Sequence, residues 1–244
     1  MTKTIFLLNI GQYAPAITRL TYPFINLYAK RIGATVHPIT ERKFPEWPVV
    51  YEKLQIFELA KQIGSDWNIY IDSDALIHPE CPDFTVYLSK GTVLFYRFDN
   101  SLLRFKADEY FYRNGRYISP GNWFTIASDL CLDLWHPLEL TLQETMARIT
   151  PTPKELAFGM TAEHLVDDYA LAQNLSRFGF QFKSGQQICK EYGFDGVPVY
   201  RDGQDNLASE FFYHEYLLSV EEKAGKIAER IKEWRVEKYL EDFV

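Results

Sequence analysis

The sequence predicts an α/β protein, a three-layer α/β/α sandwich with helices on both faces of one mostly parallel, mixed sheet. Two observations support this fold class. Short apolar runs alternate with amphipathic helical segments through the first half of the chain. A strand, a helix and a second strand follow one another near the start, an order that favours parallel pairing with a right-handed crossover. The 244 residues are also enough to bury a complete hydrophobic core.

The first three elements are expected within the first forty residues. The apolar run Ile5–Ile10 reads as a buried strand that ends in a turn. A helix is expected from about Ala16 to Ile32, because Gly33 supplies the left-handed conformation that ends many helices. The segment Ala34–Ile39 is the second strand.

A second helix–strand pair follows. The segment Glu52–Ile63 is expected to be a helix capped by Gly64, and the apolar positions on one of its faces are Ile56, Phe57, Ala60 and Ile63. The segment Trp67–Ile71 is expected to be a strand that runs directly into acidic residues. In a sheet of this kind, ligands bind beyond the carboxyl ends of the strands. The turn after the first strand and the acidic turn are therefore expected to share one crevice.

The second half of the chain has weaker signals. Strands are expected over Thr92–Tyr96 and Trp123–Ile126, and a long irregular loop over residues 98–121. A helix is expected from Thr161 to about Phe178. Ser219 and Glu222 form a capping box, which predicts a long amphipathic C-terminal helix.

Composition excludes several classes of function. With 26 Lys and Arg against 33 Asp and Glu, the net charge is −7, which argues against a nucleic-acid partner. The cysteines Cys81, Cys131 and Cys189 are scattered, so neither a disulfide framework nor a structural zinc site is expected. No apolar run has the length of a membrane span or the layout of a secretory signal, so a soluble, cytoplasmic protein is expected.

The most informative segment is the acidic turn after the apolar strand Trp67–Ile71. Asp72 and Asp74 are separated by one small residue, and an extended chain would place both carboxylates on one side. Two like charges need a neutralising partner, which a divalent cation with oxygen ligands provides. Such a cation also makes a bound diphosphate a good leaving group. The alternative is a pair of solvated turn aspartates, but the position after a buried strand favours the functional interpretation.

The helix Glu52–Ile63 with its early Lys53, followed by an apolar strand and Asp-x-Asp, resembles the nucleotide-sugar-binding half of GT-A-fold glycosyltransferases. The first strand, which ends at Asn9 before a Gly/Tyr loop, is similar to the strand that holds the nucleotide in this family. The resemblance implies a nucleotide-diphosphate sugar donor and Mn²⁺ or Mg²⁺ as cofactor. It implies that Asp72 contacts the metal or the ribose and that Asp74 coordinates the metal.

Two later fragments extend the resemblance. The segment His164–Ala172 resembles an acidic pattern that opens a helix in inverting members, with Asp167 in the place of the usual Glu and Asp168 in the place of the catalytic base. A carboxylate there would take the proton of an attacking hydroxyl, although both acids can also simply favour a helix N-terminus. His214 resembles the late histidine that completes the metal site, and its alternative is a histidine bonded to a backbone carbonyl.

The same resemblance implies further contacts to the donor. The predicted nucleotide-binding residues are Asn9, Gly11, Tyr13, Lys53, Asp72, Ser73 and Lys223. Lys53 and Lys223 can equally be solvated charges on helix faces. The segment from Gly121 to Phe124 resembles an acceptor-side loop, in which Trp123 either stacks on a sugar or packs in the core. Residues 98–121 are expected to shape the acceptor pocket.

The resulting hypothesis is a single glycosyltransferase domain over residues 1–244. Residues 1–90 form the nucleotide-sugar half, residues 91–218 the acceptor half, and residues 219–244 the C-terminal helix. The partners are a nucleotide-sugar donor and a glycan or other hydroxyl acceptor, and the reaction is metal-dependent and inverting. Retention stays open, as does the oligomeric state. The alternatives are a haloacid-dehalogenase-like phosphatase, whose Asp-x-Asp usually follows the first strand, and a non-catalytic sugar- or nucleotide-binding protein.

Overall fold

The computed structural model describes residues 1–96, 122–157, 159–194, 196–201, 204–209, 211–214 and 218–241. A six-stranded sheet forms the middle layer, with the strand order β2-β1-β3-β6-β5-β7. Its strands are β1 (Lys3–Leu8), β2 (Ala34–Ile39), β3 (Trp67–Ile71), β5 (Thr92–Phe95), β6 (Phe124–Ser128) and β7 (Gln181–Ser184). Pairing is parallel except at β6, which runs antiparallel to both β3 and β5. The expected α/β class with a mostly parallel sheet is confirmed.

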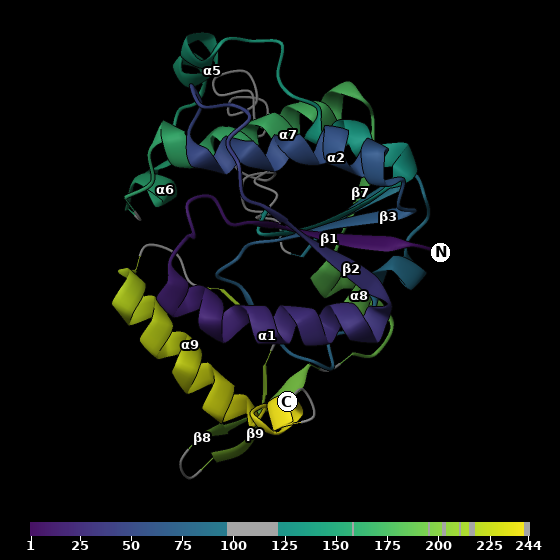
Figure 1. The fold of residues 1–244 in the computed structure, drawn as a ribbon, viewed down its shortest axis with the longest axis vertical. Coiled ribbons are helices and arrows are strands. Elements are labelled where there is room, and N and C mark those ends of the chain that lie inside the picture. Colours follow the sequence, from purple (N-terminus) through teal and green to yellow (C-terminus); the bar gives the residue numbers. More distant parts are fainter. Residues whose placement is uncertain are drawn as a thin grey trace.

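Helices cover both faces of this sheet (Figure 1). On one face lie α2 (Ile56–Ile63) and α7 (Val166–Arg177), and on the other lie α1 (Pro15–Ile32) and α8 (Gly185–Glu191). A hydrophobic core lies on each face of the sheet, and successive side chains of β1 point to opposite faces. Ile5 and Leu7 pack in the core that contains α1, whereas Phe6 packs in the core that contains α2 and α7. The C-terminal helix α9 (Val220–Trp234) packs on α1.

Shorter elements complete the described chain. The 3₁₀ segments are Val49–Gln55, Phe84–Tyr87, Asp129–Trp135 and Ala162–Leu165. The remaining helices are α5 (Leu142–Arg148), α6 (Pro153–Ala157) and α10 (Lys238–Glu241). Two small antiparallel pairs join β4 (Leu76–Ile77) to β10 (Phe212–Tyr213) and β8 (Val197–Arg201) to β9 (Gln204–Ser209).

The structure corrects several expected boundaries. The first strand covers Lys3–Leu8 rather than Ile5–Ile10, and the strand expected at Trp123–Ile126 covers Phe124–Ser128. The helix expected over Glu52–Ile63 begins as a 3₁₀ segment and becomes α-helical only at Ile56, because Glu52 is buried and holds the preceding loop. The loop expected over residues 98–121 lies outside the described residues. The helix expected from Thr161 is divided into a 3₁₀ turn and α7.

The termini of the predicted helices follow the expected chemistry. Gly33 and Gly64 adopt the left-handed conformation at the ends of α1 and α2. Ser219 and Glu222 form both hydrogen bonds of the capping box at the start of α9. Ile63, expected on the buried face of α2, is instead 43% exposed, because the helix ends there and turns away from the core.

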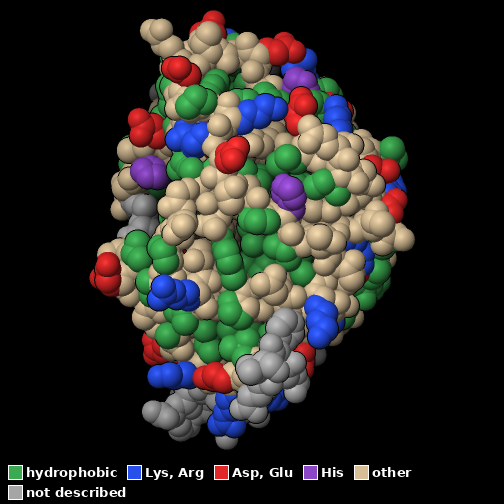
Figure 2. Space-filling model, in the orientation of Figure 1, with side chains coloured by type: hydrophobic (Ala, Val, Ile, Leu, Met, Phe, Trp, Pro, Cys, Tyr) green, Lys and Arg blue, Asp and Glu red, His purple; other side chains and the backbone are tan. Residues whose placement is uncertain are grey.

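Figure 2 shows how charged and hydrophobic side chains are distributed over one face of the molecule. On the face shown in Figure 2, Lys and Arg side chains are interspersed with Asp and Glu, and hydrophobic side chains gather in the lower half. In the described part of the chain, none of the helices combines the length and the apolar character that a membrane crossing requires.

Docking of the C-terminal segment involves a buried histidine. The ring of His78 contacts Trp234 and Tyr239, with centroid separations of 5.3 and 6.2 Å. Its Nδ1 accepts a hydrogen bond from the Glu80 N–H at 3.1 Å. Burial lowers the pKa of His78 to about 4, helped by the positive charges of Arg31 and Lys238 and opposed by Glu80.

This low pKa predicts an acid-sensitive fold. The unfolded His78 takes up a proton below its ordinary pKa of about 6.5, whereas the folded protein resists this until about pH 4. The free energy of unfolding should therefore fall between pH 6.5 and 4, by at most about 3 kcal/mol from this group. Urea unfolding at pH 7, 5.5 and 4 measures it. His78→Asn keeps an acceptor for the Glu80 N–H and should weaken the pH dependence; an identical slope in the variant would contradict the assignment.

Candidate active site

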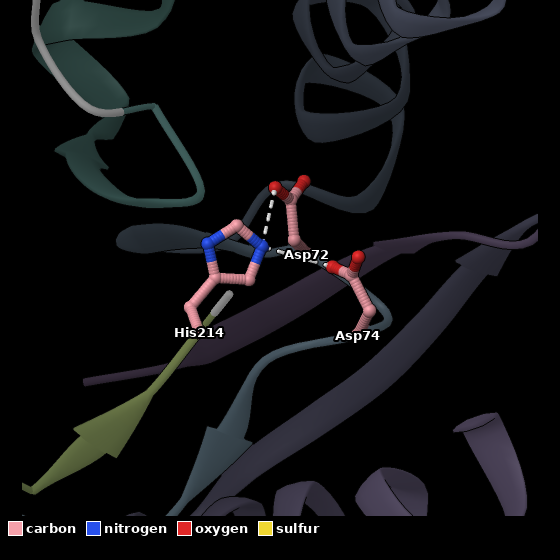
Figure 3. A group of neighbouring side chains, drawn as sticks. All are labelled: Asp72, Asp74 and His214. Atoms are coloured by element: carbon pink, nitrogen blue, oxygen red, sulfur yellow. Dashed lines mark hydrogen bonds and ion pairs between the residues drawn. The ribbon is translucent and has the colours of Figure 1, made fainter. Parts of the chain in front are cut away.

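The acidic turn lies where the fold class places a ligand, at the carboxyl end of β3. The chain leaves the sheet at Asp72, whose N–H donates to Trp123 O at 2.8 Å, and the Ala75 N–H then donates to Asp72 O at 3.0 Å. The turn is tight rather than extended. It nevertheless directs both carboxylates toward one imidazole, that of His214 (Figure 3).

Ser73 anchors this turn from beneath. Its Oγ donates to Leu8 O at 2.6 Å and lies 3.1 Å from Tyr22 Oη. Thr21 Oγ1 donates to Ser73 O at 2.6 Å. The end of β1 and the first half of α1 therefore hold the middle residue of the motif in place. Because Ser73 is buried in these bonds, its side chain is occupied with orientation of the turn.

A short strand pair explains why His214 lies so far along the chain and yet beside the motif. β4 follows the acidic turn, and β10 pairs with it antiparallel, so that Tyr213 lies opposite Leu76. The next residue after β10 is His214, whose Nε2 lies 3.0 Å from Asp74 Oδ1 and 3.6 Å from Asp72 Oδ2. On its other side the imidazole stacks on Trp123 at a centroid separation of 5.2 Å.

The surroundings of Trp123 distinguish between its two expected roles. It is 5% exposed, and its indole packs against His214 and Phe212. A side chain so buried has little surface left on which a sugar can stack. Of the two interpretations open for Trp123, packing behind the histidine is the one that the structure supports.

Two buried lysines supply further positive charge. Lys53 Nζ lies 2.7 Å from Asp167 Oδ2 and 3.2 Å from Asp72 Oδ1. Lys223 Nζ lies 2.5 Å from Asp74 Oδ2. Both lysines are buried, so neither is the solvated helix-face charge that was the alternative. Each aspartate of the motif thus has its own lysine partner as well as His214.

These partners determine the protonation of the site. Burial raises the pKa of Asp74, but the hydrogen bond and charge of His214 and the charge of Lys223 outweigh it, so the pKa lies well below its usual range. Burial lowers the pKa of Lys53, but Asp167 and Asp72 outweigh that effect and the pKa is raised. Asp74 is therefore ionised and Lys53 charged at neutral pH.

A pocket of about 180 Å³ opens beside the acidic turn. Its polar wall is formed by Lys53, Asp72, Ser73 and Asp74, and its apolar wall includes Leu8, Ile10, Tyr13, Val49, Val50 and Tyr70. The predicted crevice between the turn after β1 and the acidic turn is present here. Tyr13 lines it directly and its Oη donates to Asp74 Oδ2 at 3.4 Å, while Asn9 and Gly11 lie in the same loop.

The α7 helix contributes two acidic residues in its first turn, Asp167 and Asp168. Asp167 accepts hydrogen bonds from Asn122 Nδ2 at 2.6 Å and from the Asp168 N–H at 2.9 Å, in addition to its ion pair with Lys53. Asp168 is buried next to it. It is Asp167 that the structure connects to the motif, through Lys53.

Sequence reasoning missed several members of this site. Tyr70 Oη donates to Asp72 Oδ1 at 2.5 Å. Side chains two positions apart in a strand point to the same face, so the sequence did contain a signal for this contact. Asn122 contacts both Lys53 and Asp167, with an Oδ1–Nζ distance of 3.4 Å. No sequence pattern marks Thr21 or Tyr22, and Asn122 lies in the segment that resembles an acceptor-side loop without a role of its own being expected, since these roles depend on how distant segments pack.

Removing the charge of Lys53 should cause a large loss of stability. Lys53→Met leaves the carboxylates of Asp72 and Asp167 without their shared cation, so the free energy of unfolding should fall by about 3 kcal/mol at pH 7. The deficit should shrink at pH 4, where the carboxylates can take up protons. Chemical denaturation at both pH values measures this, with Lys190→Met as control, because the Lys190 side chain of α8 is exposed. A loss below about 1 kcal/mol at pH 7 would contradict the buried ion-pair network.

Comparison with known proteins supports the fold. No family model matches the chain, and no curated protein matches it in sequence. Among solved structures, it is similar to a glycosyltransferase involved in the glycosylation of the major capsid of PBCV-1. The two have a TM-score of 0.52 and 11% sequence identity, over 94% of this chain and 100% of that chain. At this identity the likeness concerns the fold, and the chain therefore has a glycosyltransferase-like α/β fold.

Proposed function

We propose that this protein is a metal-dependent glycosyltransferase that moves a sugar from a nucleotide-diphosphate donor to an acceptor hydroxyl with inversion. One observation carries the proposal. Asp72, Asp74 and His214, which come from segments 140 residues apart, meet beside a pocket at the carboxyl edge of the sheet. The glycosyltransferase-like fold supports the same reaction class.

The donor atoms of this cluster fit a divalent cation. One ligand atom from each of Asp72, Asp74 and His214 lies within 4.8 Å of the others. Two carboxylate oxygens and an imidazole nitrogen suit Mn²⁺, and Mg²⁺ is the alternative with oxygen-rich coordination. When bound, the cation would supply positive charge that stabilises the diphosphate leaving group.

The pocket is suited to the nucleoside part of the donor. Tyr13, Val49 and Val50 provide an apolar wall, and the acidic turn closes the other side. In this proposal the nucleoside lies along the loop that contains Asn9, Gly11 and Tyr13, and its diphosphate extends toward the cation-binding residues. Ser73 acts by holding the turn, because its hydroxyl is already engaged by Leu8 O and Tyr22.

The acceptor hydroxyl needs a carboxylate within hydrogen-bond reach that takes its proton as it attacks. Asp167 is bound to Lys53 and Asn122 and thereby holds Lys53 beside Asp72. By the resemblance of the segment His164–Ala172 to the acidic pattern of inverting glycosyltransferases, Asp168, the neighbouring acid in the first turn of α7, is the proposed base that takes the hydroxyl proton. Attack on the anomeric carbon from the side opposite the diphosphate inverts the configuration of the sugar.

Substitution of the motif tests the metal assignment. We expect the wild type to bind UDP at least tenfold more tightly with Mn²⁺ than with EDTA. Asp74→Ala should lose this difference, because it removes one of the three side chains proposed to bind the cation. Isothermal titration calorimetry measures both proteins. Asp129→Ala, which changes an exposed aspartate outside the cluster, is the matched control and should keep the Mn²⁺ effect. GDP replaces UDP if the wild type binds no UDP. An unchanged Mn²⁺ effect in Asp74→Ala would refute the assignment.

A second variant tests the base. Asp168→Asn is expected to keep the affinity for nucleotide and Mn²⁺ but to lower kcat by a factor of about 10² to 10⁴, as loss of a general base does. Release of the nucleotide from a panel of nucleotide sugars with glycan acceptors measures turnover, and the anomeric configuration of the product is read by NMR. Glu163→Gln, exposed just before α7, is the control. Near-normal turnover of Asp168→Asn would exclude this residue as the base.

A further inference from the structure

Lys223 forms the tightest ion pair of the candidate metal site. Its Nζ lies 2.5 Å from Asp74 Oδ2, and the two residues are 149 positions apart in the chain. Both side chains are 10% exposed. The contact therefore connects the first turn of α9 to the turn after β3, inside the protein rather than across its surface.

The helix itself does not favour a lysine at this position. The first turn of a helix carries a partial positive charge, which attracts anions and repels a buried ammonium group. The first turn of α9 already holds Glu221 and Glu222, and Ser219 completes the capping box. Lys223 is thus not explained by helix formation. Its burial is explained by the opposite charge of Asp74, because a buried cation requires a close anionic partner.

The two oxygens of Asp74 face different basic side chains. Oδ1 lies 3.0 Å from His214 Nε2, on the side of the candidate metal site. Oδ2 contacts Lys223 and accepts a hydrogen bond from Tyr13 at 3.4 Å. A divalent cation held by Asp72, Asp74 and His214 would bring two further positive charges next to the ammonium group. In a buried site with weak solvent screening, these charges repel strongly.

We infer that Lys223 is an internal counter-ion that competes with the divalent cation for Asp74. In the absence of the cation, Lys223 neutralises Asp74 and keeps the acidic turn folded against α9. Entry of the cation releases the ammonium group from Asp74. Lys223 thereby lowers the affinity for the cation and couples metal binding to the position of the first turn of α9. This inference rests on the proposed function, since it takes the metal site as given.

Removal of the ammonium group tests the competition. Lys223→Met keeps the length and packing of the side chain but not its charge. We expect it to bind Mn²⁺ at least tenfold more tightly than the wild type, measured from the electron paramagnetic resonance signal of free Mn²⁺ during titration without nucleotide. Lys226→Met, on the exposed face of α9, is the matched control and should bind like the wild type. Circular dichroism confirms that each variant is folded.

The outcomes separate this inference from the metal site itself. Tighter binding by Lys223→Met, or binding by this variant and not by the wild type, supports the competition. Equal or weaker binding by a folded Lys223→Met overturns it and leaves the metal site standing. Binding by neither protein overturns the inference together with the metal-dependent part of the proposed function.

A measurement on the wild type does not depend on the folding of a variant. Reductive methylation followed by mass spectrometry reports how accessible each lysine Nζ is. Saturating Mn²⁺ should increase the labelling rate of Lys223 at least threefold, because its amine leaves Asp74, and should leave Lys226 unchanged. An unchanged labelling rate of Lys223 in protein that has bound Mn²⁺ would overturn the inference.

Discussion

The site is governed by the repulsion between two carboxylates at the end of one strand. Asp72 and Asp74 cannot both be ionised in a partly buried turn without positive partners. The fold brings three basic side chains to this turn from separate parts of the chain: Lys53 from the 3₁₀ segment before α2, His214 after β10, and Lys223 from α9. Charge compensation at this turn therefore also connects α9 and the residue after β10 to the end of β3.

Two kinds of support keep this arrangement in place. Backbone and hydroxyl contacts from β1 and α1 hold Ser73, so the turn has little freedom to reorient. The β4–β10 pair and the stacked Trp123 hold the imidazole of His214 against the carboxylates. Because these supports come from apolar or neutral contacts, they remain when the charges in the site change. Metal binding can then act on Lys223 without dismantling the turn.

Much of the fold could be predicted from local pattern. The strands Ala34–Ile39 and Trp67–Ile71 have the expected bounds, and the glycine caps and the Ser219 capping box act as expected, because each depends on a few adjacent residues. The short strands β4 and β10 could not be predicted. They contain two residues each, and their pairing depends on tertiary packing rather than on any local period.

The candidate site divides in the same way. The acidic turn was visible because a buried strand runs into it, and the structure places His214 and Lys223 against Asp74 of this turn. The role of Asp167 was not visible, since two adjacent acids at a helix start look alike until a partner such as Lys53 distinguishes them. The 3₁₀ start of the second helix was missed for a related reason. Glu52 accepts from Arg42 Nε at 2.6 Å and from two loop N–H groups, and this long-range contact overrides the helical period.

The central claim is that Asp72, Asp74 and His214 form one metal centre. Electron spin echo envelope modulation of the Mn²⁺-loaded protein tests it most directly, because the modulation from ¹⁴N reports a nitrogen bonded to the ion. The account predicts ¹⁴N modulation from one imidazole in the wild type and its loss in His214→Gln that still holds Mn²⁺. Tightly bound Mn²⁺ without ¹⁴N modulation in the wild type, or with the same modulation in His214→Gln, would contradict the account.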